Sequence, residues 1–139
     1  MPLPDELVAR IERTLALYGA GRPLPAAEIR ERLSAIGLLP DEDYVEFVSR
    51  WGGCFVGVPV HGWGNASLLG SETCVDLTMR CRADYGDLVD GLVIADDGAG
   101  NPIWISPSGP VRLIDHDNGF EVVQLADSFR ALLDDNVPS

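Results

Sequence analysis

The segment VIADDGAGNPIWIS, residues 93–106, decides which class of fold this chain adopts. Two short runs rich in β-branched residues, LVIAD (residues 92–96) and PIWIS (residues 102–106), flank the sequence DGAGN. Aspartate, glycine and asparagine all tolerate the positive φ angles that a tight hairpin requires. The segment therefore predicts two antiparallel strands joined by a short turn.

Two other interpretations of this acidic turn are a calcium loop and a catalytic pair of carboxylates. In a calcium loop of EF-hand type that starts at Asp96, the third and fifth positions are Gly98 and Gly100, which offer no side-chain oxygen. The twelfth position is Pro107 instead of the bidentate glutamate. Asp96 and Asp97 are neighbours, and neighbouring residues of a strand point to opposite faces, so they do not easily share one catalytic site. A hairpin turn accounts for every residue type instead.

A second pair of runs, PVRLID (residues 110–115) and EVVQL (residues 121–125), repeats the pattern around HDNGF. Turn residues recur about every ten residues, which predicts a meander of antiparallel strands. Within it, Asp115, His116 and Asp117 offer two or three ligands for a metal, but a turn between strands explains the same residues. We favour the turn and expect no metal, no other cofactor and no catalytic residue.

The first third of the chain has helical periodicity. Three segments carry it: PDELVARIERTLALYG (residues 4–19), PAAEIRERLSAIG (residues 25–37) and LPDEDYVEFVSRWGG (residues 39–53). The third is the clearest, because a proline and three acids suit its N-terminus and a Gly-Gly pair suits its end.

The remaining segments complete the expected order of elements. CFVGVPV (residues 54–60) predicts a strand, TCVDLTMRCRADYG (residues 73–86) gives a weak helical pattern, and ADSFRALLDD (residues 126–135) predicts a closing helix. The expected fold is therefore α+β, with N-terminal helices, an antiparallel or mixed β-sheet and a C-terminal helix. The length suits one domain over residues 1–139.

The three tryptophans differ in their surroundings. Trp51 lies on the apolar face of the predicted helix in residues 39–53, so we expect it in the core. Trp63 stands in a glycine-rich loop, which favours exposure. Trp104 alternates with isoleucines on a short strand, so it faces either a second apolar layer or solvent.

The formal net charge is −12, and it is unevenly distributed. Residues 1–82 hold eleven acids and eight arginines, a net charge of −3, whereas residues 83–139 hold eleven acids and two arginines, a net charge of −9. This balance argues against binding to nucleic acid, because the phosphates would be repelled. It favours solubility or a basic partner.

The cysteines and the N-terminus bear on the compartment. Cys54, Cys74 and Cys81 are too irregularly spaced for a zinc site and odd in number for a disulfide framework, so we expect three reduced thiols. The N-terminus lacks the basic start of a secretory signal, and no run approaches the ~18 apolar residues of a transmembrane helix. We therefore expect a cytoplasmic protein that does not act at a membrane.

Four segments in this order, LPDEDYVEFVSRWGG, VIADDGAGNPIWIS, VRLIDHDNG and LADSFRALL, resemble the SUKH superfamily of bacterial toxin-immunity proteins. That group also includes the Syd protein and a yeast regulator of cell-wall glucan synthesis. The resemblance leaves the first predicted helix and residues 62–90 unmatched. It implies an α+β sandwich-like fold, no enzymatic activity, and a cytoplasmic protein that binds and blocks a cognate toxin.

Many such toxins are nucleases with basic active-site clefts, which an acidic surface would complement. The predicted function is neutralisation of a cognate basic toxin by steric and electrostatic occlusion. We expect the partner contacts at Trp63, Asp96, Asp97, Asp115 and Asp117. Two alternatives stay open: a regulatory scaffold that binds a host protein, and a small metal-dependent hydrolase built on Asp115, His116 and Asp117.

Overall fold

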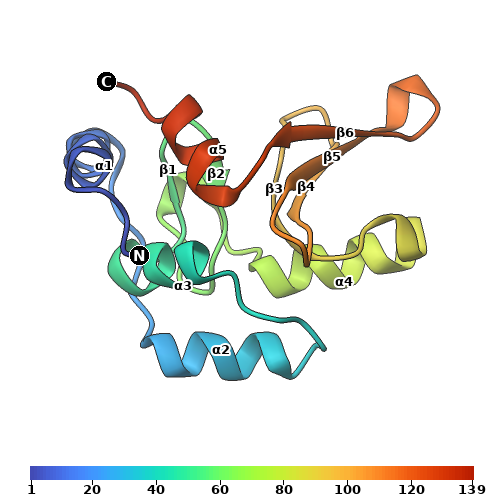
Figure 1. Cartoon of the computed structure of the whole chain (residues 1–139), viewed down its shortest axis with the longest axis horizontal. Coiled ribbons are helices and arrows are strands. Elements are labelled where there is room, and N and C mark those ends of the chain that lie inside the picture. The colour runs from blue at the N-terminus through green and yellow to red at the C-terminus, as the bar shows by residue number, and fades with distance from the viewer.

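A computed structural model describes the whole of residues 1–139. It has the α+β class that the sequence predicts, with helices before the sheets and one helix after them (Figure 1). The helices are α1 (Asp5–Tyr18), α2 (Ala26–Ser34), α3 (Glu42–Trp51), α4 (Cys74–Tyr85) and α5 (Phe129–Asn136). The strands are β1 (Cys54–Phe55), β2 (Pro59–Val60), β3 (Leu92–Asp96), β4 (Pro102–Ile105), β5 (Val111–Asp115) and β6 (Glu121–Ala126). Three short 3-10 helices complete the order: η1 (Ser67–Leu69), η2 (Gly86–Leu88) and η3 (His116–Asn118).

The larger sheet is the predicted meander. Its four strands pair in the order β3-β4-β5-β6, and every pairing is antiparallel. Because the strand direction alternates, the β3–β4 turn and the β5–β6 turn lie at the same end of this sheet. The acidic residues of both turns therefore come from one end of the molecule.

Two apolar cores lie on opposite faces of this sheet. The main core, a cluster of 29 buried residues, extends from Leu3 to Val137 and includes buried residues of α1, α2, α3, α5 and the sheet. The second core lies between the sheet and α4, which covers the sheet from below in Figure 1. It consists of Leu77, Cys81, Val89, Val93, Trp104 and Ile114.

Trp104 is fully buried in this second core. Of the two positions that strand alternation allowed, it therefore faces the second apolar layer and not solvent. Its indole N–H donates a 2.8 Å hydrogen bond to Asp90 Oδ1, so the polar edge of the ring is satisfied. Trp51 is buried in the main core, as predicted.

Helix α4 forms although the helical periodicity of its apolar residues is weak. A capping box begins it: Thr73 Oγ1 accepts the N–H of Asp76, and the Asp76 carboxylate accepts the N–H of Thr73, each at 3.0 Å. Its buried face includes a polar residue, Thr78, whose hydroxyl accepts the N–H of Val93 at 2.9 Å. A threonine among the buried positions weakens the apolar pattern while anchoring the helix to β3.

The prediction of one strand over residues 54–60 is wrong. These residues form β1 and β2, joined by a tight turn in which Gly57 has φ +90°. A Cβ on Gly57 would lie 1.9 Å from the carbonyl oxygen of Asn136, at the end of α5. The turn therefore depends on a contact with the other end of the chain.

The Gly-Gly pair after α3 allows two backbone segments to cross in direct contact. Gly21 donates its N–H to the Trp51 carbonyl at 2.8 Å. A Cβ on Gly21 would lie 2.2 Å from the Gly64 oxygen and 2.3 Å from the Gly53 oxygen. Gly52 has φ +67°, a conformation that favours glycine. This crossing joins the helices to the loop that follows β2.

Two arginines hold α5 against the N-terminal helices. Arg10 of α1 donates to Asp134 Oδ1 at 2.7 Å and to the Val137 carbonyl at 2.6 Å. Arg130 of α5 forms a bidentate pair with Asp43 of α3, at 2.7 and 3.2 Å. These ion pairs and hydrogen bonds thus hold α5 against the main core.

Candidate functional site

The two hairpin turns share one side chain, Asn101, which is 5% exposed. Its Nδ2 donates to Asp97 Oδ2 at 2.9 Å, within the β3–β4 turn. Its Oδ1 accepts the backbone N–H of His116 at 3.0 Å and also contacts the His116 ring nitrogen Nδ1, across in the β5–β6 turn. One buried amide therefore fixes the position of each turn relative to the other.

Asp97 organises the β3–β4 turn. Its Oδ1 accepts the N–H groups of Ala99 at 2.9 Å and of Asn101 at 3.2 Å. Desolvation raises the pKa of the Asp97 carboxyl, but these hydrogen bonds and the one from the Asn101 amide outweigh it and lower the pKa below its ordinary value. Asp97 is thus a stable anion that faces solvent.

Two of the other predicted aspartates, Asp96 and Asp115, also accept turn amides with one carboxylate oxygen and leave the second oxygen free. Asp96 Oδ1 accepts the N–H of Gly98 at 2.8 Å, and Asp115 Oδ1 accepts the N–H of Asp117 at 3.1 Å. Asp117 is exposed, with its Oδ1 at 3.4 Å from His116 Nε2. The structure therefore brings Asp96, Asp97, Asp115 and Asp117 to one end of the sheet, as negative charges held by short turns.

A groove of about 610 Å³ lies beside the β3–β4 turn, between the β1–β2 hairpin, β6 and α5. Apolar side chains line part of it: Phe55, Val58, Ile103, Leu125 and Leu132. Three acids also line it: Asp96, Asp97 and Asp135. The groove thus combines an apolar surface with carboxylates, two of which belong to the predicted contact set.

Asp135 and the apolar part of the groove were missed by sequence reasoning. Asp135 follows Leu132 by three positions on α5, so helical spacing alone could have placed the two residues on one side of the helix. The joining of α5 to the β1–β2 hairpin could not have been found in the same way, because it is a contact between distant segments.

Trp63 does not line this groove. The expectation that it is exposed is wrong, because it is half-buried and packs against the main core. The guanidinium of Arg32 lies over its ring at 5.8 Å from the centroid, a cation–π contact with α2. The fifth predicted contact residue is therefore separate from the four aspartates.

The residues of the metal hypothesis have structural partners. Asp115 and Asp117 shape the turn that contains η3, and the His116 ring contacts Asn101. His61 lies elsewhere, with its Nδ1 at 2.7 Å from the Glu72 carbonyl oxygen. No three His, Cys, Asp or Glu side chains lie together in an arrangement that could hold a metal ion.

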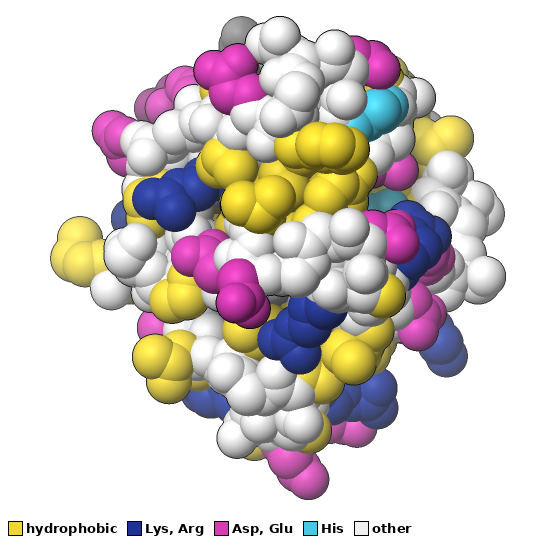
Figure 2. All heavy atoms as spheres, turned by 90° about the vertical axis from the view of Figure 1, so that its right-hand side faces the viewer, with side chains coloured by type: hydrophobic (Ala, Val, Ile, Leu, Met, Phe, Trp, Pro, Cys, Tyr) yellow, Lys and Arg dark blue, Asp and Glu magenta, His cyan; other side chains and the backbone are white.

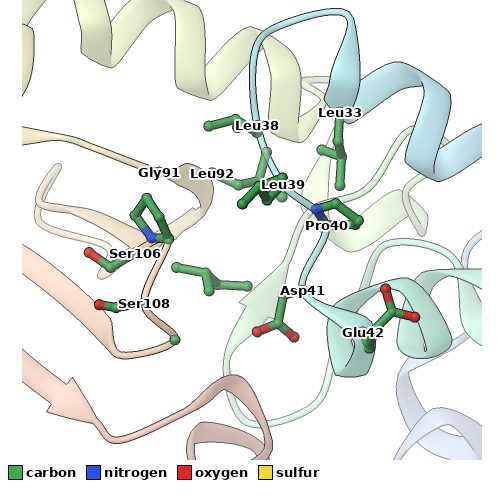
Figure 3. Close-up of a pocket in the computed structure, with 13 residues that line it drawn as sticks. Leu33, Leu38, Leu39, Pro40, Asp41, Glu42, Gly91, Leu92, Ser106 and Ser108 are labelled. Atoms are coloured by element: carbon green, nitrogen blue, oxygen red, sulfur yellow. The ribbon is translucent and has the colours of Figure 1, made fainter.

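A smaller cavity, of about 240 Å³, lies where the α2–α3 loop meets the β4–β5 turn. Figure 3 shows Pro40 and Asp41 on one side of it and Ser106 and Ser108 on the other. Asp41 Oδ1 accepts the N–H of Tyr44 at 3.0 Å and so caps α3. Burial is the main reason why the pKa of the Asp41 carboxyl is raised. This aspartate therefore has a structural role, at the start of a helix.

The three cysteines are free and buried. Burial raises the pKa of Cys54 and of Cys74 to about 12, and it also raises the pKa of Cys81. A thiol must lose its proton to act as a nucleophile, so these environments disfavour cysteine chemistry.

The chain belongs to the SMI1 / KNR4 family (SUKH-1), whose family model matches residues 23–135. The match includes both hairpin turns and most of α5, and α1 lies outside it. Comparison with curated proteins and with solved structures gives no match. The family is consistent with an immunity-type or a regulatory protein, suggests a protein partner, and is not known for enzymatic activity.

None of the five helices is long and apolar enough to cross a membrane.

Proposed function

We propose that this protein is a cytoplasmic immunity protein that binds a cognate bacterial toxin and blocks it by occlusion. The observation that carries the proposal is the groove beside the shared hairpin end, with its apolar side chains and its three carboxylates. Family membership supports a protein as the partner.

The chemistry of the groove favours a lysine or arginine of the partner. The aliphatic stem of such a side chain packs against apolar groups, such as Phe55 and Leu125, while its charged end stays polar. Asp96 and Asp135 provide carboxylates for charge-assisted hydrogen bonds. The free oxygens of Asp115 and Asp117, on the neighbouring turn, extend the negative potential beyond the groove.

The charge of the whole chain supports a basic partner. Residues 83–139, which include the sheet and α5, have a net charge of −9. A basic active-site cleft, such as that of a nuclease, would be attracted to this surface and covered by it. Four aspartates form the primary contact in this proposal, and Trp63 is a separate contact for a partner that extends to α2.

The test is co-expression and binding with toxin-like proteins encoded next to this gene. We expect one of them to bind at submicromolar concentration and to lose its toxicity in the presence of this protein. If none is bound or neutralised at micromolar concentration, the immunity function is wrong.

A charge-matched pair of variants tests the site. Asp96→Asn with Asp117→Asn removes two charges from the hairpin end, and Asp5→Asn with Glu12→Gln removes two exposed charges from α1. At low salt the first variant should associate about tenfold more slowly than the second, because electrostatic steering acts mainly on the association rate. Equal association rates would remove Asp96 and Asp117 from the interface.

The second candidate function, a regulatory protein-binding module, is consistent with the same family. Affinity capture from the source cell distinguishes the two. A housekeeping protein recovered with no toxin gene nearby would favour the regulatory function.

A further inference from the structure

We propose that β6 is a docking edge, to which an extended basic and apolar segment of the partner adds as a fifth strand of the larger sheet. This inference rests on the proposed function, because the occupant is a segment of the same basic partner. It deepens that function by adding backbone recognition to charge recognition.

Strand β6 is the free edge of the sheet. Its only neighbour is β5, and no backbone hydrogen bond joins residues 121–125 to any other segment. At an antiparallel edge, every second residue points its N–H and C=O away from the neighbouring strand. The opposite edge differs, because there the N–H of His61 donates to the Ile94 carbonyl at 2.7 Å.

Exposed apolar side chains lie on both faces of the sheet at this edge, beside the exposed polar residues Glu121 and Gln124. Val122 lies opposite Ile114 of the second core, and Val123 lies opposite Leu113, which packs against the main core. The exposed fractions are 55% for Phe120, 39% for Val122, 38% for Val123 and 40% for Leu125. Both apolar layers therefore continue to the surface at β6.

The apolar surface extends onto α4, where the ring of Tyr85 meets Phe120 edge-on at a centroid distance of 6.0 Å. Figure 2, a view from the right-hand side of Figure 1, shows hydrophobic side chains gathered in a patch, with both acidic and arginine side chains around it. Proteins usually protect such an edge with lysine, proline or a bulge. Strand β6 contains neither lysine nor proline, and its register shift comes only near its end, at Leu125.

Charge identifies the occupant as a basic partner segment, not a second copy of this chain. Residues 92–127, which contain the whole sheet, hold six acids and one arginine. A second copy would bring a net charge of −12 against another −12, whereas a basic segment would be attracted. Leu125 belongs both to β6 and to the acid-lined groove, so one segment could pair with β6 and place a basic side chain in the groove.

The experiment uses synthetic nine-residue peptides and the isotope-labelled full chain. The first peptide has five β-branched residues between paired lysines, and the second has glutamates in place of the lysines. The third is the lysine peptide with N-methyl groups on alternate backbone nitrogens. Amide NMR shifts and hydrogen exchange are measured for residues 120–126.

The lysine peptide should shift these amides and slow the exchange of alternate ones by tenfold or more. The glutamate and N-methyl peptides should bind at least tenfold more weakly, since they lack the charge and the backbone donors respectively. Perturbation of the hairpin turns alone, with β6 unchanged, would overturn strand addition. Protection of β6 without peptide, with a concentration-dependent dimer in sedimentation, would show that a second copy is the occupant and would overturn it too.

Two variants test the side chains of the edge. Val123→Ser should weaken binding of the lysine peptide about fivefold, whereas Leu68→Ser, at a more exposed apolar residue of η1, should leave it unchanged. Equal affinities of the two variants for the lysine peptide would count against β6 as the docking edge. The peptide measurements do not involve a toxin, so a failure of strand addition is distinguishable from a failure of toxin neutralisation.

Discussion

At the scale of single residues, Asn101 determines the geometry of the acidic end. Its amide is the only side chain that hydrogen-bonds to both hairpin turns, and it is buried between them. The sequence predicts a turn that contains asparagine, but it cannot show that the other partner is His116, fifteen positions further along the chain. The site therefore depends on a contact that local patterns do not contain.

Replacing Asn101 should change both the stability of the fold and the titration of Asp97. Asn101→Ala leaves the His116 N–H without its acceptor, so we expect the free energy of unfolding to fall by about 1–3 kcal/mol. The pKa of the Asp97 carboxyl should rise toward its ordinary value, because one of the hydrogen bonds that lower it is lost. Carboxylate NMR titration and chemical denaturation measure the two effects.

The sign of the pH dependence follows from the lowered pKa. Ionised Asp97 contributes stability above its unfolded-state pKa, and this contribution is lost as the pH falls through the lower folded-state pKa. Asn118→Ala is the control, because Asn118 donates to Glu121 and not to Asp97. An equal effect of both variants on the Asp97 titration would contradict the role of Asn101.

Asp41 has the opposite pH behaviour. Burial raises its pKa, so the protonated form is favoured in the folded state and stability is lost as the pH rises through the folded-state pKa. Asp41→Asn keeps a capping oxygen and removes the buried charge, so its stability at pH 7 should equal or exceed that of the unmodified protein. Asp41→Ala should lose about 1 kcal/mol, the usual value of a helix cap. If both variants lose the same stability, the carboxylate charge itself stabilises α3.

At the scale of elements, the sequence predicts those that are determined locally. The helix at α3 has an acidic start, an apolar stripe and a glycine end, and the hairpin at residues 93–106 has its turn residues in place. The β1–β2 turn was not predictable, because Asn136 from the end of the chain lies directly against Gly57. The groove was not predictable either, because it forms only where α5 lies beside β6. The partial burial of Trp63 also depends on a distant residue, Arg32, which lies over its ring.

The backbone crossing at Gly21, which joins the N-terminal helices to the loop that follows β2, gives a prediction about stability. Gly21→Ala should lower the free energy of unfolding by about 3 kcal/mol, since the new Cβ would lie 2.2 Å from a backbone oxygen that cannot move freely. Gly19→Ala is the control: Gly19 has φ +86° but open space around its Cβ, so it should cost only about 1–2 kcal/mol. Denaturation midpoints of the two variants measure the difference. A smaller loss at Gly21 than at Gly19 would mean that the crossing is not tightly packed.

At the scale of the whole molecule, α5 connects the parts. It packs in the main core, lines the groove, and is held by Arg10 from α1 and by the Arg130–Asp43 pair from α3. The sheet joins this unit to the second core, because its strands have one face in each. We therefore propose that residues 1–139 unfold as one domain.

This proposal predicts a single cooperative transition. Trp51 lies in the main core and Trp104 in the second, so in each variant that keeps one of these as the only tryptophan the fluorescence and circular dichroism unfolding curves should coincide. Arg130→Met should lower the free energy of unfolding by about 2 kcal/mol in both single-tryptophan variants. The reason is that the Asp43 carboxylate, 23% exposed, loses its cation. Arg80→Met, which breaks an exposed pair with Glu72, should lower the free energy of unfolding by at most about 0.5 kcal/mol. If the fluorescence curve of the variant that keeps Trp104 separates from its circular dichroism curve, α4 and its core form an independent unit and the single-domain proposal is wrong.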